Sequence, residues 1–271
     1  MIGFGWLEAQ NDKRIADRAN KHFDAEDFDW KKAKHDWAVK LRASSMPEWQ
    51  LFDSPQAQLT DKIESGMDNV VVSKCGTWAY RNLTLPKGQF FNWYSNSGKV
   101  YTTHSGWSSS ERRPESGVVV FDDDYVFPAI YESKNGGDSF NRSKPWMSLT
   151  PNEMITLRPG IRKSKGHTVI AGLGIGWMLA MVAERPKVKK ITLVEISDSL
   201  VNWLWPKIEA RLTDDQKAKV VIKVGDAKDV MPDLEADVGL IDIFPGMGYN
   251  HEDTHQWRER CPRIKDMWLW G

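Results

Sequence analysis

Short apolar runs alternate with stretches of helical periodicity along the second half of the chain. Runs rich in Val, Ile and Leu predict strands near residues 167–171, 190–195, 219–224, 237–242 and 264–270. The segments between them predict helices near residues 176–185, 198–212, 227–231 and 253–260. Strands that alternate with helices are typical of a parallel sheet with right-handed crossovers. We therefore expect a doubly wound, mostly parallel α/β fold over residues 150–271.

The first half of the chain differs in composition and in the pattern of its apolar residues. Residues 8–44 are rich in Ala, Lys, Asp and Glu and predict one or two charged amphipathic helices. Short β-branched or aromatic runs, separated by turn residues, then predict a small antiparallel sheet from strands near 70–72, 90–94, 100–103 and 118–121. We expect two regions, an N-terminal one over residues 1–149 and a cofactor-binding one over residues 150–271.

A helix start stands at the junction of the two regions. Thr150 is placed to act as the N-cap, with Pro151 in the first turn and Glu153 able to complete a capping box. Because Pro159 follows, this helix is expected to end near Leu157.

Three glycines follow the first predicted strand of the second half, at Gly172, Gly174 and Gly176. Glycine lets a backbone approach a ligand closely, and the N-terminus of the next helix offers unpaired N–H groups to an anion. An apolar strand, a glycine turn and a helix together indicate a nucleotide-binding crossover unit of the Rossmann-like kind.

Acidic residues stand at the ends of the next three predicted strands. Glu195 follows the second strand and is placed to accept hydrogen bonds from both hydroxyls of a ribose. Asp226 follows the third strand, where it can accept from an exocyclic adenine amine. Asp242 ends the fourth strand, over the crevice where the strand order is expected to reverse. These positions predict a site for a nucleoside cofactor.

The residue after the last glycine separates two cofactor classes. A dinucleotide motif has glycine at the position of Trp177, where helix and strand pack closely. The glycine spacing and the added acid after the third strand instead resemble the class I S-adenosylmethionine-dependent methyltransferases. The resemblance implies that the glycines face the methionine part of the cofactor, that Glu195 holds the ribose and that Asp226 holds adenine. It also implies two further strands after the fifth, where this sequence ends soon after Trp270.

A narrower resemblance lies just upstream of the glycines. Asn152-Glu-Met-Ile, followed by Arg158-Pro, is similar to the helix that precedes the glycine motif of spermidine synthases. That family has acids where Ile175 and Pro245 stand in this chain. The resulting candidates for cofactor binding are Gly172, Gly174, Gly176, Glu195, Ile196, Asp226, Ala227 and Asn152. The candidate catalytic residue is Asp242, which would position the cofactor or acceptor or act as a base.

Three functions are compatible with these residues. The first is an S-adenosylmethionine-binding methyltransferase that acts on an unidentified acceptor. The second is an aminopropyltransferase similar to spermidine synthases, which would use decarboxylated S-adenosylmethionine. The third is a non-catalytic binding or assembly protein that retains the fold.

Composition narrows the remaining possibilities. The 271 residues include 37 Lys plus Arg and 37 Asp plus Glu, so no overall charge draws the chain to nucleic acid or to a membrane. No apolar run approaches the roughly 20 residues of a membrane span. The two cysteines suggest a reducing compartment, and we expect a cytoplasmic protein. His251 and His255 have no evident third ligand, so no metal site is predicted. An uncovered sheet edge after the fifth strand would favour a homo-oligomer.

Overall fold

The computed structural model describes residues 49–53, 56–58, 70–85, 90–92, 118–120, 125–133, 140, 145–149, 151–243 and 254–270. Five strands of the second half form one parallel sheet in the order β10-β9-β8-β11-β12. They are β8 (Gly166–Ala171), β9 (Val188–Glu195), β10 (Val220–Val224), β11 (Val238–Ile241) and β12 (Met267–Leu269). The chain order reverses between β8 and β11, which places a crevice at the carboxyl ends of these two strands. The predicted doubly wound α/β fold is confirmed.

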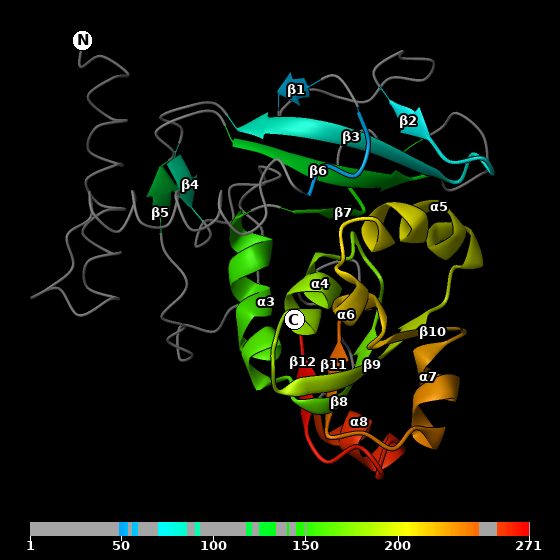
Figure 1. Cartoon of the computed structure of the whole chain (residues 1–271). Helices are drawn as coiled ribbons and strands as arrows, with labels where there is room; N and C mark the ends of the chain where they lie inside the picture. Colours follow the sequence, from blue (N-terminus) through cyan, green and yellow to red (C-terminus); the bar gives the residue numbers. More distant parts are fainter. Residues whose placement is uncertain are drawn as a thin grey trace, which may run out of the picture.

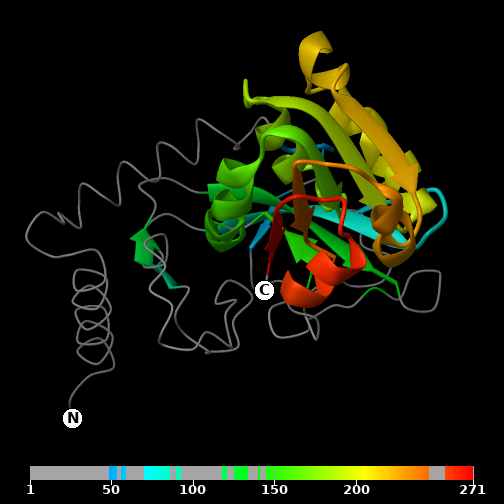
Figure 2. The ribbon, with the colours of Figure 1, turned by 90° about the horizontal axis from the view of Figure 1, so that it is seen from below.

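Helices cover both faces of this sheet (Figures 1 and 2). They are α3 (Pro151–Lys163), α4 (Trp177–Ala183), α5 (Asp198–Glu209), α6 (Asp214–Lys217), α7 (Ala227–Val230) with the 3-10 turn η1 (Met231–Asp233), and α8 (Thr254–Arg260). Ile170, Leu193 and Leu240 pack in one hydrophobic cluster with α3, α4 and α5. Their strand neighbours Val169 and Val194 belong to a second cluster with α7, η1 and α8. Successive strand residues therefore serve opposite layers, as a sheet buried on both faces requires.

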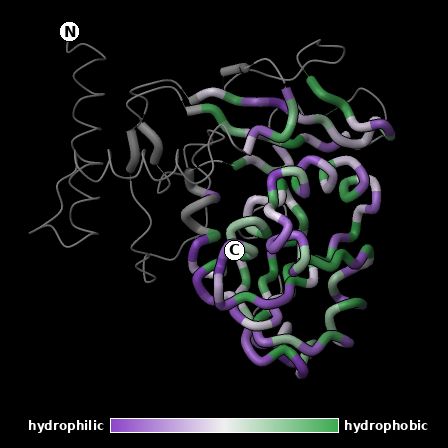
Figure 3. Tube along the Cα trace, viewed as in Figure 1, coloured by the Kyte–Doolittle hydropathy of each residue, from purple (hydrophilic) through white to green (hydrophobic). Residues whose placement is uncertain are grey.

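Hydrophobic residues concentrate along the inner strands of the parallel sheet (Figure 3). β8 and β11 lie at the centre, and the residues of β11 are all buried. The edge strand β10 is different, because Val221 and Val224 are 45% and 48% exposed. None of the described helices is long and apolar enough to cross a bilayer.

The helix α3 is longer than the sequence predicted. It continues through Pro159 to Lys163, although this proline provides no N–H for the preceding turn. Packing explains the difference: a Cβ on Gly160 would lie 2.5 Å from Cε3 of Trp268, so the helix rests directly on the segment of β12. Lys163 also donates a hydrogen bond of 2.8 Å to Asp266. These tertiary contacts offset the roughly 3 kcal/mol that an internal proline costs.

A second sheet precedes the parallel one in the chain. Its order is β1-β3-β6-β7, with β2 also paired to β3; every pairing is antiparallel except that of β1 with β3. The strands are β1 (Gln56–Gln58), β2 (Val71–Val72), β3 (Trp78–Leu85), β6 (Tyr125–Glu132) and β7 (Met147–Ser148), and β4 (Phe90–Asn92) pairs separately with β5 (Val118–Val120).

The two longest strands of the first half were not predicted. β3 mixes the polar residues Arg81, Asn82 and Thr84 with apolar ones and shows no regular alternation. The apolar run of β6 is interrupted by Pro128, which is unfavourable inside a strand. The predicted runs at 70–72, 90–94 and 118–121 correspond to β2, β4 and β5. The expected helices over 8–44, the expected strand at 100–103 and Thr150 lie outside the described residues.

The antiparallel sheet packs against α5 and the glycine segment of the second half (Figure 1). Phe52 stacks on Trp203 of α5 with ring centroids 5.2 Å apart. The indole of Trp78 donates to the hydroxyl of Ser199 at 3.3 Å. The indole of Trp49 donates to the carbonyl of Ile175 at 3.0 Å. Residues from both halves of the chain therefore form one continuous hydrophobic cluster.

Candidate functional site

The glycine segment turns tightly between β8 and α4. Gly172, Gly174 and Gly176 have φ angles of 97°, 55° and 78°, in the left-handed region that residues with a side chain rarely adopt. A Cβ on Gly172 would collide with the carbonyl oxygen of Asp242, so the segment runs directly against the end of β11. A Cβ on Gly176 would lie 2.5 Å from Cδ1 of Ile208 in α5. The glycines are therefore required by the close packing at the switch point.

Glu195 lies at the end of β9 and is 5% exposed. Its Oε2 accepts a hydrogen bond of 2.7 Å from the backbone N–H of Leu173, in the glycine segment. Its Oε1 accepts one of 2.9 Å from the N–H of Ser197. A carboxylate offers about four lone-pair positions, so each oxygen retains one acceptor position for a further donor. The side chain thus links two strand ends and keeps the capacity to accept from ribose hydroxyls.

Ile196 and Asp226 lie beside this carboxylate. β9 and β10 pair in parallel with Val224 opposite Glu195, which places Ile196 at the level of Gly225, next to Asp226. The side chain of Ile196 is 67% exposed, the largest value among the exposed large hydrophobic residues of the described chain. An acid, an exposed apolar side chain and a second acid therefore stand together at one edge of the sheet.

Asp226 also has a structural role. Its Oδ1 accepts a hydrogen bond of 2.8 Å from the N–H of Lys228 and caps the N-terminus of α7. Ala227 is 5% exposed and packs in the cluster beneath α7, so a ligand could contact it only through its backbone. Asn152 belongs to the first turn of α3, but its side chain lies outside the described residues.

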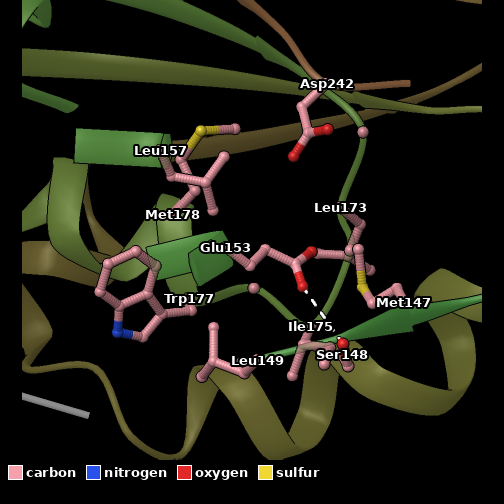
Figure 4. A pocket seen from close by; sticks show the side chains of 13 residues that line it. Met147, Ser148, Leu149, Glu153, Leu157, Leu173, Ile175, Trp177, Met178 and Asp242 are labelled. Carbon is pink, nitrogen blue, oxygen red and sulfur yellow. Dashed lines mark hydrogen bonds between the residues drawn. The ribbon is translucent and has the colours of Figure 1, made fainter. Parts of the chain in front are cut away.

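A small cavity opens at the switch point (Figure 4). Its volume is about 20 Å³, enough for about one water molecule. Glu153 of α3 and Asp242 at the end of β11 point their carboxyl groups into this space (Figure 4). The other lining residues are apolar side chains, glycines and one serine: Met147, Ser148, Leu149, Leu157, Gly172, Leu173, Gly174, Ile175, Gly176, Trp177 and Met178.

Enclosure by protein changes how these two carboxyls titrate. Burial raises the pKa of Asp242 to about 7. Burial, together with the nearby charge of Asp242, holds the pKa of Glu153 well above its usual range, and hydrogen bonds from Ser148 oppose this shift only in part. The hydroxyl of Ser148 donates to Oε2 of Glu153 at 3.5 Å. The two carboxyls therefore keep their protons to a higher pH than exposed acids do.

Glu153 is the site residue whose position the sequence did not predict. The sequence assigned Glu153 only a capping-box role toward Thr150, which lies outside the described residues, and did not place its carboxyl at the cavity, which it lines. A readable signal was present in the spacing of the helix. Glu153, Leu157 and Ile161 are four residues apart and lie on one face, and Leu157 and Ile161 are buried. An acid that continues a buried helical stripe is a candidate for a functional group.

Trp177 begins α4 directly after the glycines. It is 5% exposed and lines the cavity, and its indole Nε1 is buried without a hydrogen-bond partner. A glycine at this position would allow the close helix–strand approach of a dinucleotide site, and the large indole fills that space instead. The structure thus agrees with the sequence in disfavouring a dinucleotide.

Among the residues that the structure describes, no group of three or more His, Cys, Asp or Glu side chains is placed to hold a metal ion. His255 is exposed and its Nδ1 lies 3.5 Å from a carboxylate oxygen of Glu259. His251 lies outside the described residues. Cys261 is buried, and Cys75 is exposed.

Comparisons with known proteins concern the fold alone. No family model matches the sequence, and no curated protein matches it either. Solved structures with a similar arrangement include an S-adenosylmethionine-dependent methyltransferase from Geobacter sulfurreducens (20% identity, TM-score 0.34, 45% of this chain and 48% of that one). A second is the corresponding enzyme from Thiobacillus denitrificans (18% identity, TM-score 0.33, 44% and 48%). Both were solved with S-adenosyl-L-homocysteine.

A third is precorrin-8w decarboxylase from Methanobacterium thermoautotrophicum (12% identity, TM-score 0.34, 45% of this chain and 62% of that one). This chain therefore spans about half to three fifths of the length of these structures. The narrower resemblance to spermidine synthases stays a prediction.

Proposed function

We propose that the chain binds S-adenosylmethionine at the carboxyl edge of its parallel sheet and is a methyltransferase. The observation that carries the proposal is the grouping of Glu195, Ile196 and Asp226 on adjacent strand ends. Glu195 would accept from the ribose hydroxyls, Ile196 would cover one face of adenine, and Asp226 would accept from the adenine amine. The methyltransferases from Geobacter sulfurreducens and Thiobacillus denitrificans, solved with S-adenosyl-L-homocysteine, agree with this cofactor class.

The exposed state of Ile196 is the part of this grouping that a purely structural role does not explain. Covering a large apolar side chain that is 67% exposed with a flat, apolar base lowers the free energy of the complex. Complete burial of such a side chain contributes about 1.5–3 kcal/mol, so covering the exposed part would contribute about 1–2 kcal/mol. Glu195 is already fixed by two backbone donors and would need no reordering when the ribose binds.

The cofactor, when bound, would supply an electrophilic methyl group on a sulfonium. The chain's own residues would hold the nucleoside, exclude water and align the acceptor, since alignment accounts for much of the rate of such a transfer. Asp242 lies at the switch point beside the glycines and would orient the acceptor or receive its proton. We propose that residues 1–149 contribute acceptor specificity, because Trp49 and Met147 of β7 contact the glycine segment directly.

Isothermal titration with S-adenosyl-L-homocysteine tests the proposal. The variant Ile196→Lys should weaken binding about ten-fold, equivalent to about 1.4 kcal/mol. Val221→Lys is the matched control, because Val221 is a similarly exposed apolar residue of the same sheet that lies away from the carboxyl edge. Absence of binding to the unmodified protein would refute the proposal. Equal effects of the two substitutions would refute the assignment of the adenine face.

Two other functions remain candidates, and the same titration separates them. Preference for decarboxylated S-adenosylmethionine would indicate an aminopropyltransferase, which the two acids of the cavity favour. Tight cofactor binding without methyl transfer to any member of an acceptor panel would indicate a non-catalytic protein. Transfer of a radiolabelled methyl group to a protein, nucleic-acid or amine acceptor would establish the methyltransferase.

A further inference from the structure

The amino end of the parallel sheet carries an uneven charge, although the whole chain has 37 Lys plus Arg and 37 Asp plus Glu. Two segments enter this end: residues 161–166 lead from α3 into β8, and residues 184–190 lead from α4 into β9. Together they contain seven Lys or Arg and one acid, Glu184. Positive charge is therefore concentrated at the end of the sheet opposite to the carboxyl edge.

Hydrogen bonds hold these two segments side by side. Arg185 donates from Nη2 to the carbonyl of Arg162 at 2.8 Å and from Nε to the carbonyl of Ser164 at 3.3 Å. The N–H of Gly166 donates to the carbonyl of Lys187 at 2.7 Å. Two basic segments that are separate in the sequence therefore form one surface.

The cations at this junction form a basic patch, which consists of Lys165, Arg185, Lys187, Lys189, Lys190 and Lys219. Arg185 and Lys219 donate to backbone carbonyls, which are neutral, so these bonds do not compensate their positive charges. Among the described residues, no ion pair reaches Lys187, Lys189 or Lys190, and all three are exposed. The patch therefore presents several positive charges to solvent.

The other half of the same sheet end is balanced. Three cations that precede β12 each lie within 3.4 Å of a carboxylate oxygen: Arg258 of Asp266, Arg263 of Asp233 and Lys265 of Asp237. A surface that serves only solubility has charges of both signs interspersed, as this half does. The basic patch departs from that arrangement, which indicates an anionic partner.

We propose that the basic patch binds the phosphate backbone of a nucleic-acid duplex. The strands β8, β9 and β10 are adjacent, so the points where the chain enters them span about 10 Å, two strand spacings of about 4.8 Å. A duplex carries one phosphate charge per roughly 1.7 Å of its axis, so about six phosphates lie over this width. Lysine ammonium groups contact phosphates as point charges and need no fixed geometry.

The composition of the two segments separates a duplex from other anionic partners. None of the exposed large hydrophobic residues of the described chain lies in them, whereas binding to a membrane surface uses apolar side chains that insert beside the cations. They contain no aromatic residue, and binding of a single strand relies on aromatic side chains that stack on the bases. A duplex requires neither, because its phosphates lie on its outside.

The patch is remote from the residues assigned to the cofactor. Lys190 and Glu195 belong to the same strand, β9, and five residues of a strand span about 16 Å. A duplex could therefore be held at the amino end of the sheet while the nucleoside site stays open. The inference does not depend on the proposed function, so the two can fail separately.

Fluorescence anisotropy with the full chain measures the binding. The probes are fluorescein-labelled duplexes of RNA and of DNA, each of about 20 base pairs, and the corresponding single strands, between about 50 and 200 mM salt. The test variant combines Lys187→Gln with Lys189→Gln. The matched control combines Arg258→Gln with Arg263→Gln, which removes the same charge from the same end of the sheet, where each guanidinium already faces a carboxylate.

We expect the unmodified protein to bind both duplexes, with the logarithm of the association constant falling linearly with the logarithm of the salt concentration. The test variant loses two phosphate contacts, so this slope should become shallower by about 2 and the affinity at the lowest salt should fall at least about ten-fold. The control should change the affinity by less than about three-fold. The two duplexes should also bind within about three-fold of each other, because the phosphates that they share make the contact.

Thermal unfolding shows that the variants are folded. Substitutions at exposed positions change the unfolding free energy by about 0.5 kcal/mol or less, so the midpoint should stay within about 2 °C of that of the unmodified protein. Affinity for S-adenosyl-L-homocysteine should be the same in both variants. If this ligand fails to bind at all, the proposed function fails and the anisotropy experiment still tests the patch.

Four results would overturn the inference. The first is absence of duplex binding at the lowest salt, and the second is equal loss of affinity in the test variant and the control. The third is tighter binding of a single strand than of either duplex. The fourth is stronger association with vesicles of phosphatidylcholine and phosphatidylserine in equal parts than with the duplexes, which would assign the patch to a membrane surface.

Discussion

The carboxyl edge of the parallel sheet has two parts that differ in how they are built. The edge over β9 and β10 carries Glu195, Ile196 and Asp226, and its apolar side chain is open to solvent. The switch-point cavity between β8 and β11 is enclosed by protein, and it contains two acids whose pKa values are raised. The first part bonds its acids to backbone N–H groups, whereas in the second, among the described residues, no hydrogen bond reaches the carboxylate of Asp242. The comparison separates a region with bonded acids and an open apolar side chain from a region whose two acids have raised pKa values.

The packing of the glycine segment gives the largest expected effect. Gly176→Ala places a side chain at a φ of 78° and 2.5 Å from Cδ1 of Ile208. We expect the free energy of unfolding to fall by about 3 kcal/mol, from the strained backbone and the overpacking together. Urea denaturation measures it. Ile208→Val removes the nearest of the three atoms that the new Cβ would meet, so the same substitution in that background should cost about 1 kcal/mol less. Equal costs in both backgrounds would show that the collision does not matter.

A substitution at Glu195 tests the hydrogen bond that joins the end of β9 to the glycine segment. Glu195→Gln presents an amide NH₂ to one of two backbone donors, Leu173 N or Ser197 N, and so loses one hydrogen bond. We expect the unfolding free energy to fall by about 2 kcal/mol and binding of 5′-methylthioadenosine to weaken by at least about ten-fold. Thermal unfolding and calorimetry are the measurements. Unchanged affinity for the nucleoside would remove the ribose role from Glu195.

The stability that Asp242 contributes should fall as the pH rises, whereas the stability from an ion-paired surface acid rises with pH. Because the pKa of Asp242 is raised to about 7 in the folded chain, the folded state binds a proton that the unfolded state has lost above about pH 4. Its contribution to stability is therefore greatest below pH 4, falls as the pH rises to 7 and stays constant above it. Asp242→Asn should flatten this slope and raise the unfolding free energy at pH 8 by on the order of 2 kcal/mol, a value reduced for the partial exposure of the group. Denaturation at pH 5 and pH 8 measures the change. An unaltered slope would mean that Asp242 is ionised in the folded protein.

The sequence predicted the open part of the edge better than the enclosed part, for a physical reason. Glu195 and Asp226 follow apolar runs that become adjacent parallel strands, so their positions in the sequence place them together. Glu153 reaches the cavity from a helix before the first strand, and the length of that helix depends on the contact of Gly160 with Trp268. A contact between residues so far apart in sequence cannot be read from local periodicity.

The antiparallel sheet is a second region that local periodicity does not predict. β3 places the polar residues Arg81 and Asn82 in buried positions, so its pattern does not separate an inner from an outer face. Strand prediction from alternation requires one face to be in contact with water. The short strands β2, β4 and β5 were predicted because β-branched or aromatic residues dominate them, although they form the smaller part of the structure.

The smallest expected effect separates the two roles of Asp226. Asp226→Ala removes the cap of α7 and should lower the unfolding free energy by about 1 kcal/mol. Asp226→Ser restores a cap but has too short a side chain to reach the base, so it should recover stability without recovering affinity for 5′-methylthioadenosine. Asp226→Asn keeps both the cap and a carbonyl acceptor, and should stay within about 0.5 kcal/mol of the unmodified protein in both measurements. If Ser restored affinity together with stability, Asp226 would act only through the helix, and recognition of adenine would depend on the exposed face of Ile196.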